Sequence, residues 1–178
     1  IASRGLGDVY KRQDLFNPIW KVDCNEPRYR IDDQGNSVPY ATPPGPSELI
    51  GTPVLYEGKV YCAIGQDPEH GDGVGRLSCI DARNGEIIWK NTDVGRTIST
   101  VSVFEDLVYV AEYAGLIHCM DANTGEVYWS YDSFSRIWGS TLVAGGKVLL
   151  GNEDGDLLII DHGKDKPEVE MINMGAPV

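Results

Sequence analysis

The sequence has no apolar run that approaches the length needed to cross a bilayer, about 20 residues. It also has little positive charge, since 15 Lys and Arg are set against 27 Asp and Glu, which gives a formal net charge of −12 over 178 residues. A surplus of negative charge repels phosphate backbones and anionic lipid surfaces. The composition therefore argues against a membrane-spanning helix and against nucleic acid as a partner.

Motifs for cysteine- or histidine-based chemistry are also lacking. The sequence contains four cysteines, yet it has no metal-type spacing, no haem-type Cys-x-x-Cys-His and no adjacent Cys-Cys pair. Cys62 and Cys79 fall on two strands expected to pair as a hairpin, nearly opposite each other, so a disulfide is one interpretation. We favour the other, in which they are buried thiols that pack as small apolar side chains. His118 and His162 have no catalytic partner visible in the sequence.

An internal repeat dominates what the sequence does contain. Residues 81–89, DARNGEIIW, recur as residues 121–129, DANTGEVYW, at an offset of 40 residues. A third copy is more degraded: Asp161 follows at the same offset, but Val169 stands where a tryptophan is expected. Units repeated at this spacing are supersecondary elements that bury their faces against one another.

Each repeat has the pattern of short strands. In the middle copy, residues 100–104 alternate with period two, and residues 107–111 are rich in β-branched and aromatic side chains. Two further strands, residues 116–120 and 126–129, follow tight turns. Four strands joined in this way predict an antiparallel meander. The expected fold class is all-β, a partial β-propeller of four-stranded antiparallel blades.

The repeated motif has a structural explanation. An Asp before a turn can accept backbone N–H bonds and hold the turn closed. A Trp at the end of the outer strand can pack between neighbouring blades and bury about 150–250 Å². We expect six repeated residues to serve architecture and not chemistry: Asp81, Gly85, Trp89, Asp121, Gly125 and Trp129.

The pattern Asp-Ala-x-x-Gly-Glu-x-x-Trp resembles the tryptophan-docking motif of quinoprotein-type, or pyrroloquinoline-quinone-like (PQQ-like), propeller repeats, over about residues 51–170. Cys79 and Cys119 stand in place of the leading Ala of that motif. The resemblance implies a ring of seven or eight blades. Such rings occur in periplasmic quinone-dependent dehydrogenases and in non-enzymatic relatives, such as the lipoprotein of the outer-membrane assembly machinery. WD40-like propellers share the period, but they end their blades with Trp-Asp, which is absent here.

About three blades fit in the chain, so we expect it to be an internal piece of a longer propeller. Residues 1–13 match no part of the repeat and are expected to be a non-native leader, followed by a propeller fragment over residues 14–178. Within that fragment we expect the last strand of a blade at 14–23, a Pro-rich insertion at 24–49, blades at about 50–90, 91–130 and 131–170, and the start of another blade at 171–178.

Loop order predicts where function lies. In a meander of strands A to D, the B–C turns and the D–A links emerge on one face, and the insertions 24–49 and 66–75 both fall there. Arg96, Arg136 and Trp138 lie in the D–A links and form a candidate binding face, because functional residues concentrate in loops on a rigid scaffold. For the two matched arginines, Arg96 and Arg136, we favour the alternative, in which they make structural contacts between blades.

A metal site in the 66–75 insertion is a further hypothesis. Carboxylates and an imidazole close together could hold a divalent ion. The spacing matches no calcium-loop pattern, which favours a solvated loop. The candidate ligands are Asp67, Glu69, His70 and Asp72.

Two functions stay open. We favour a non-enzymatic PQQ-like propeller that binds a protein, peptide or glycan through the insertion-bearing face, in the periplasm or outside the cell as the resemblance implies. The alternative is a fragment of a PQQ-dependent alcohol or sugar dehydrogenase, with PQQ and calcium as cofactors of the full-length protein. The adjacent cysteine pair of the alcohol-oxidising members is absent, although sugar-oxidising members lack it too.

Truncation of a repeated tryptophan, by Trp89→Ala or Trp129→Ala, is expected to lower the free energy of unfolding by about 3–5 kcal/mol, the range for core aromatics. The loss follows from the apolar area that each indole buries between blades. Thermal unfolding followed by circular dichroism measures it. An unchanged melting temperature would contradict the position between blades.

Overall fold

The computed structural model describes residues 18–39, 42, 45–71 and 73–178, and the account that follows concerns these residues. They form three four-stranded antiparallel sheets, and in each sheet the strands are hydrogen-bonded in the order of the sequence. Two short 3-10 helices, η2 (Pro27–Tyr29) and η3 (Pro68–His70), interrupt the connections. The predicted all-β fold of four-stranded blades is confirmed.

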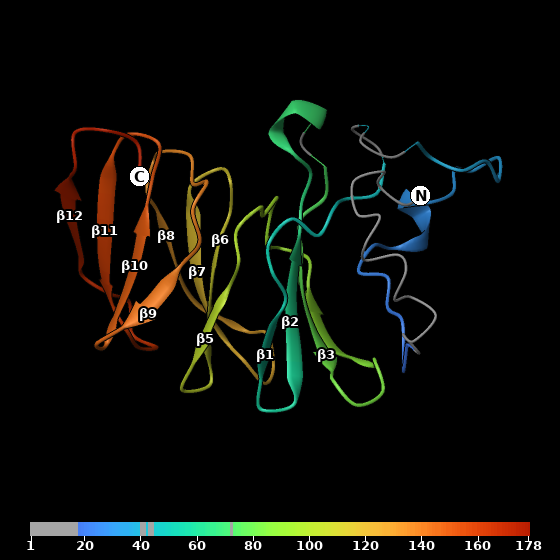
Figure 1. Cartoon of the computed structure of the whole chain (residues 1–178), viewed down its shortest axis with the longest axis horizontal. Helices are drawn as coiled ribbons and strands as arrows, with labels where there is room; N and C mark the ends of the chain where they lie inside the picture. Colours follow the sequence, from blue (N-terminus) through green and yellow to red (C-terminus); the bar gives the residue numbers. More distant parts are fainter. Residues whose placement is uncertain (1–17, 40–41, 43–44, 72) are drawn as a thin grey trace, which may run out of the picture.

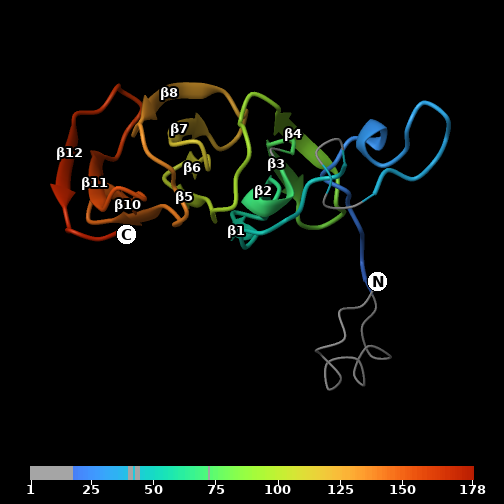
Figure 2. The same ribbon diagram turned by 90° about the horizontal axis from the view of Figure 1, so that it is seen from above.

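The three sheets stand side by side (Figures 1 and 2). The first strands of successive sheets are neighbours, because β5 contacts both β1 and β9. The first sheet comprises β1 (Val54–Tyr56), β2 (Lys59–Ile64), β3 (Arg76–Asp81) and β4 (Ile87–Asn91). The second comprises β5 (Ser102–Phe104), β6 (Leu107–Ala111), β7 (Leu116–Asp121) and β8 (Val127–Asp132). The third comprises β9 (Leu142–Ala144), β10 (Lys147–Gly151), β11 (Asp156–Asp161) and β12 (Val169–Asn173).

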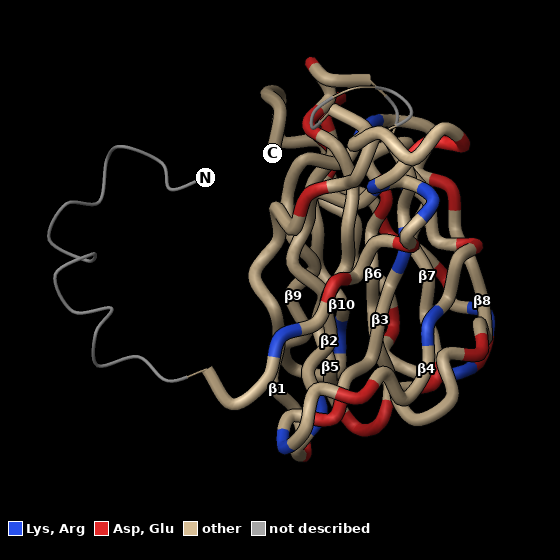
Figure 3. Tube along the Cα trace, turned by 90° about the vertical axis from the view of Figure 1, so that its right-hand side faces the viewer, with Lys and Arg blue, Asp and Glu red and all other residues tan. Residues whose placement is uncertain are grey.

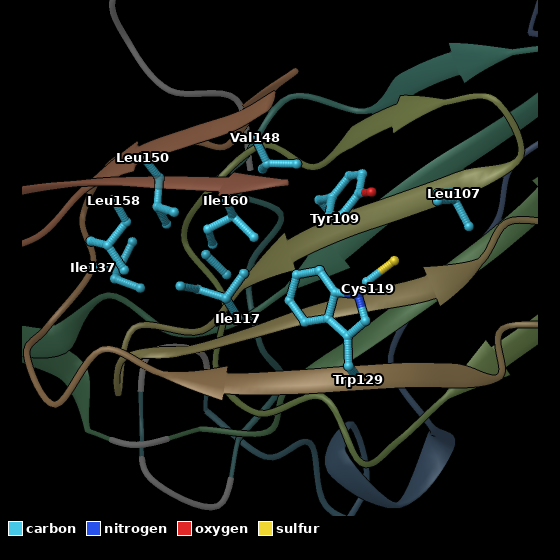
Figure 4. Packing of buried hydrophobic residues seen from close by; sticks show 11 residues of the cluster. Leu107, Tyr109, Ile117, Cys119, Trp129, Ile137, Val148, Leu150, Leu158 and Ile160 are labelled. Atoms are coloured by element: carbon cyan, nitrogen blue, oxygen red, sulfur yellow. The ribbon is translucent and has the colours of Figure 1, made fainter. Parts of the chain in front are cut away.

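The apolar cores lie between sheets. Val108 and Val110 of β6 pack in a cluster with the first sheet, whereas Tyr109 and Ala111 pack in a cluster with the third. Figure 4 shows the second of these clusters, with Trp129 lying beside Tyr109. Both faces of the second sheet are therefore buried, which explains why all five residues of β6 are buried and why its sequence is continuously apolar.

Each motif tryptophan joins its own sheet to the next one along the chain. The indole Nε1 of Trp89 donates to the carbonyl oxygen of Ala122 at 3.0 Å, and that of Trp129 donates to the carbonyl oxygen of Gly163 at 3.0 Å. Trp20 makes the same contact with the first sheet, to the carbonyl oxygen of Ala82 at 2.9 Å. Described residues 18–23 form no strand, yet Trp20 meets the first sheet as the later tryptophans meet theirs.

A glycine lies under the indole at two of these contacts. Gly85 and Gly125 have φ values of +76° and +75°, which glycine adopts readily. A Cβ on Gly125 would lie 2.5 Å from Cε3 of Trp89, and one on Gly85 would lie 2.8 Å from the Trp20 ring. The turn therefore needs glycine for its backbone conformation and also for the close approach of the indole.

The motif aspartates close the same turns. An Oδ1 oxygen of Asp81 accepts from the backbone N–H of Arg83 at 2.8 Å, and one of Asp121 accepts from that of Asn123 at 2.8 Å. The Arg83 guanidinium also bonds the Asp81 carboxylate and lowers the pKa of Asp81 to about 2, with help from that backbone N–H. Both side chains are committed to their turns.

The register of the first sheet excludes the disulfide between Cys62 and Cys79. Cys62 pairs with Ser78, and Cys79 pairs with Tyr61, so the two cysteines are offset by one residue. Successive side chains in a strand point to opposite faces, which separates the two thiols by the sheet. The favoured interpretation is confirmed, because both are free and are 5% and 0% exposed.

Gly125→Ala and Gly58→Ala make a matched pair of substitutions. Their φ values are +75° and +74°, but a Cβ on Gly58 would meet nothing within 4 Å in the described chain. Gly58→Ala should cost about 1–2 kcal/mol for the left-handed backbone alone. Gly125→Ala should cost about 1–3 kcal/mol more, because the indole of Trp89 must move. Urea unfolding of both variants tests this, and equal losses would contradict the contact.

Candidate binding face

The two insertions meet at one end of the sheets. This end, called the upper face here and seen at the top of Figure 1, consists of the turns and links at residues 65–71, 73–75, 92–101, 112–115, 133–141 and 152–155. The Ser47 hydroxyl donates to the carbonyl oxygen of Val74 at 2.6 Å, and the Gln66 amide nitrogen donates to that of Thr42 at 2.8 Å. The later part of the 24–49 insertion thus supports the 66–75 insertion.

The earlier part of the 24–49 insertion takes a different course. It lies along the open side of the first sheet, where Glu26 pairs with Arg76 at 2.9 Å (Figure 1). Sequence reasoning assigned the whole insertion to one face. The structure divides it between the upper face and the side of the sheet, because the buried Arg76 guanidinium draws Glu26 inward.

Tyr113 is the centre of the upper face. It follows β6 in the turn to β7, its N–H donates to the Arg96 carbonyl at 2.8 Å, and its carbonyl accepts from the Ile137 N–H at 3.2 Å. Its ring lies 4.3 Å from the Arg96 Cζ and 5.6 Å from the Arg136 Cζ. The ring of Trp138 meets it edge-on at 5.0 Å. The three predicted face residues therefore gather around Tyr113, which the sequence pattern did not single out.

The two matched arginines differ in what they contact. Arg96 is half-buried, and its Nη1 donates to the carbonyl oxygen of Gly71 at 2.6 Å, which ties the link to the 66–75 insertion. The side chain of Arg136 is 60% exposed and pairs at 3.8 Å with Glu153, itself 43% exposed. Exposed pairs of this kind contribute about 0–1 kcal/mol. These contacts favour an architectural role for Arg96 and leave Arg136 accessible.

Phe134 is an exposed aromatic residue in the link that also carries Arg136 and Trp138. Its side chain is 87% exposed, and its φ of +56° lies in the left-handed region, which is uncommon for a bulky residue. The neighbouring Ser133 fixes this conformation, since its hydroxyl donates to the carbonyl oxygens of Gly115 at 3.0 Å and Ser135 at 2.9 Å. The sequence carries no signal for this exposure, because it depends on the path of the link.

A row of hydrogen-bonded, mostly buried polar side chains lies beside the upper face. The sequence did not predict it. Nδ1 of His118 is hydrogen-bonded to the Ser130 hydroxyl at 2.7 Å, and Nε2 to a Glu112 oxygen at 2.7 Å. The same Glu112 oxygen accepts from the N–H of Gly95 at 2.7 Å. His118 pairs with Ser130 across the ladder between β7 and β8, and only that register brings the groups together. These hydrogen bonds hold the link before β5 against the second sheet.

The metal hypothesis finds no ligand set. Asp67 caps η3, accepting from the N–H of Glu69 at 2.9 Å, and Asp72 lies outside the described residues. Among the residues that are described, no group of three His, Cys, Asp or Glu side chains could hold a metal ion. Acidic positions instead spread over both ends of the sheets (Figure 3). The described candidates do not fit a calcium site.

Two cavities adjoin the open side of the first sheet. Their volumes are about 440 Å³ and about 250 Å³. The larger is lined by Glu26, Arg76 and Lys90 among others, and the smaller by Cys24, Ser47 and Ile64 among others. Both lie between the early part of the 24–49 insertion and the sheet, and neither is lined by Arg96, Tyr113 or Arg136.

Comparison with known families decides the affiliation. The sequence profile of a family described as outer membrane protein assembly factor BamB matches residues 73–166, more than half of the chain. The chain belongs to this PQQ-like repeat family. The resemblance inferred from the repeated motif is confirmed. None of the curated protein sequences matches the chain.

Solved structures show the same propeller fold over part of their length. BamB from Moraxella catarrhalis is 23% identical, with a TM-score of 0.54 over 68% of this chain and 36% of that one. Quinohemoprotein alcohol dehydrogenase from Comamonas testosteroni is 25% identical, with a TM-score of 0.52 over 68% of this chain and 20% of that one. The corresponding enzyme ADHIIG from Pseudomonas putida HK5 is 24% identical, with a TM-score of 0.54 over 69% of this chain and 20% of that one. The PQQ-like chain thus spans about a third or less of these proteins' lengths.

Replacing the two arginines separately tests their different contacts. Arg96→Ala removes the bond to Gly71 and the stacking on Tyr113, so the free energy of unfolding should fall by about 1–3 kcal/mol. Arg136→Ala is the matched control, and its exposed pair should cost less than about 0.5 kcal/mol. Chemical unfolding of both variants measures the difference. A loss of equal size would contradict the separation of roles.

Proposed function

We propose that this PQQ-like propeller segment is a non-enzymatic scaffold that binds a protein or peptide through its upper face. The observation that carries the proposal is the exposure of two aromatic side chains in one link, Phe134 at 87% and Trp138 at 50%, with Arg136 between them. Aromatic residues and arginine are enriched among the residues that dominate binding energy at protein interfaces.

Rigidity of the link supports this role. Trp138 packs edge-on against Tyr113, which is only 5% exposed and is hydrogen-bonded to links on both sides. Ser133 fixes the turn at Phe134. A surface ordered before binding loses less conformational entropy when a partner arrives, so its contacts yield more affinity.

Family membership supports a protein partner and a location outside the cytoplasm. The family description names an outer membrane protein assembly factor, and we infer by analogy that this chain acts in the periplasm or is secreted. Among the described residues, no helix is long and apolar enough to span a membrane.

The second candidate is a piece of a PQQ-dependent alcohol or sugar dehydrogenase. The specific observation in its favour is the likeness to the quinohemoprotein alcohol dehydrogenases. Addition of PQQ and calcium, with alcohols or sugars and a redox dye, tests it. Robust turnover would overturn the scaffold proposal.

Binding is tested by selecting displayed peptides on the immobilised chain and measuring their dissociation constants. Trp138→Ala should weaken selected peptides by about tenfold, which corresponds to about 1.4 kcal/mol. Phe104→Ala is the matched control, since Phe104 is an aromatic with 43% exposure at the other end of the second sheet. It should leave affinity unchanged. Equal effects of the two substitutions, or selection of no peptide, would contradict binding at the upper face.

A further inference from the structure

The segment around Cys24 is held firmly against the first sheet. The carbonyl oxygen of Cys24 accepts from Nη1 of Arg76 at 2.8 Å. The next residue, Asn25, exchanges two hydrogen bonds with Ser47: its side-chain nitrogen donates to the Ser47 carbonyl at 3.0 Å, and its side-chain oxygen accepts from the Ser47 N–H at 2.8 Å. Cys24 is therefore fixed by its own backbone and by that of its neighbour.

Cys62 lies on the sheet face that this segment covers. Tyr61 and Ala63 of β2 point into the core shared with the second sheet, so Cys62 between them points the opposite way. Cys24 lies over this face, because its carbonyl oxygen is bonded to Arg76, and Arg76 projects from the same face of β3 as Ser78, the ladder partner of Cys62. Two thiols from segments far apart in the sequence are thus brought to one face of the first sheet, and each shifts the pKa of the other.

The second sheet has a similar pair of positions, one on a link and one on the sheet that follows it. Val94 follows Trp89 by five residues, as Cys24 follows Trp20 by four. Val94 packs in one cluster with Val110, which lies on the central strand β6 of its sheet as Cys62 lies on β2. Cys24 and Cys62 thus lie on a link and on the second strand of the following sheet, as Val94 and Val110 do one sheet later.

The Cys24 thiol is only partly buried, and its pKa is lowered. Interaction with the Cys62 thiol lowers the pKa of Cys24 to about 7, and Ser78 and the Arg76 charge act in the same direction, against burial and the Asp23 charge. The same interaction, together with burial, raises the pKa of Cys62. Cys24 also lines the cavity of about 250 Å³. A thiolate near neutral pH is the nucleophile of thiol–disulfide exchange.

We propose that Cys24 and Cys62 are an oxidisable pair. Their disulfide would covalently link the 24–49 insertion to the first sheet. The oxidant is a small-molecule disulfide of the glutathione type. The Cys24 thiolate attacks one sulfur of the oxidant, which forms a mixed disulfide and releases one small thiolate. Cys62 then gives up its proton and attacks the Cys24 sulfur, which releases the second small thiolate. Two electrons pass to the oxidant, and the two thiol protons end on the two released thiols.

The bond would close a long loop. It spans the chain from Cys24 to Cys62 and includes the whole Pro-rich insertion and the strand β1. Cross-linking removes conformational freedom from the unfolded chain, and more so for longer loops. An oxidising compartment outside the cytoplasm would maintain such a bond.

The test treats the reduced 178-residue chain with glutathione disulfide, followed by acid quenching, alkylation of the remaining thiols and peptide mass spectrometry without reduction. The expected product is lighter by one pair of hydrogen atoms and joins the Cys24 and Cys62 peptides, with Cys79 and Cys119 recovered as alkylated thiols. Cys79→Ser, the matched control, should give the same product. Cys62→Ser should instead keep glutathione on Cys24, because the second attack is missing.

Three outcomes would overturn the proposal. One is a native chain that keeps all four thiols or keeps glutathione on Cys24, and another is a Cys62→Ser variant that takes up no glutathione. The third is a mixture of disulfide pairings among the four cysteines, like the mixture obtained when the unfolded chain is oxidised in urea. An independent readout is the rate of Cys24 alkylation, which should level off above about pH 8, whereas an unperturbed thiol with a pKa of about 8.5 would still gain rate.

Discussion

The structure depends on the contact between an indole and a turn of the next sheet. A four-stranded meander has two apolar faces and cannot bury both by itself. The indole of Trp89 covers part of one face, donates to the Ala122 carbonyl and lies on Gly125. Trp129 repeats the donation toward Gly163. Burial of the second sheet on both faces follows from these two contacts, and with it the fixed spacing of the links that cross from sheet to sheet.

The upper face inherits its order from that spacing. The turn at Tyr113 is hydrogen-bonded to the link before its own sheet and to the link after it, through Arg96 and Ile137. The exposed Phe134 and Trp138 belong to the second of these links, which is held by the Ser133 hydrogen bond to Gly115 and by the contact of Trp138 with Tyr113. Architecture and proposed binding thus use different residues of the same repeat: Arg96 holds the face together, while Arg136 remains in solvent.

The sequence predicted the elements that repeat, because periodicity records local constraints. The all-β fold, the meanders and the family followed from the offset of 40 residues between the motifs. Features that depend on one register or one loop path did not follow. The offset between Cys62 and Cys79 required the ladder of β2 and β3, since a shift of one residue reverses the face. Glu112, His118 and Ser130 come together only across β7 and β8. Phe134 is exposed although Val94, at the matching position 40 residues earlier, is buried, so the repeat did not predict its exposure.

The indole hydrogen bonds of Trp20, Trp89 and Trp129 all run the same way along the chain. Each Nε1 donates to a turn that follows it, 62 residues later for Trp20, 33 for Trp89 and 34 for Trp129. Docking by Trp89 and Trp129 therefore joins sheets that are neighbours in the sequence. A sheet emerging during synthesis would present its indole to the sheet made next, so assembly could proceed in the direction of translation, one blade at a time.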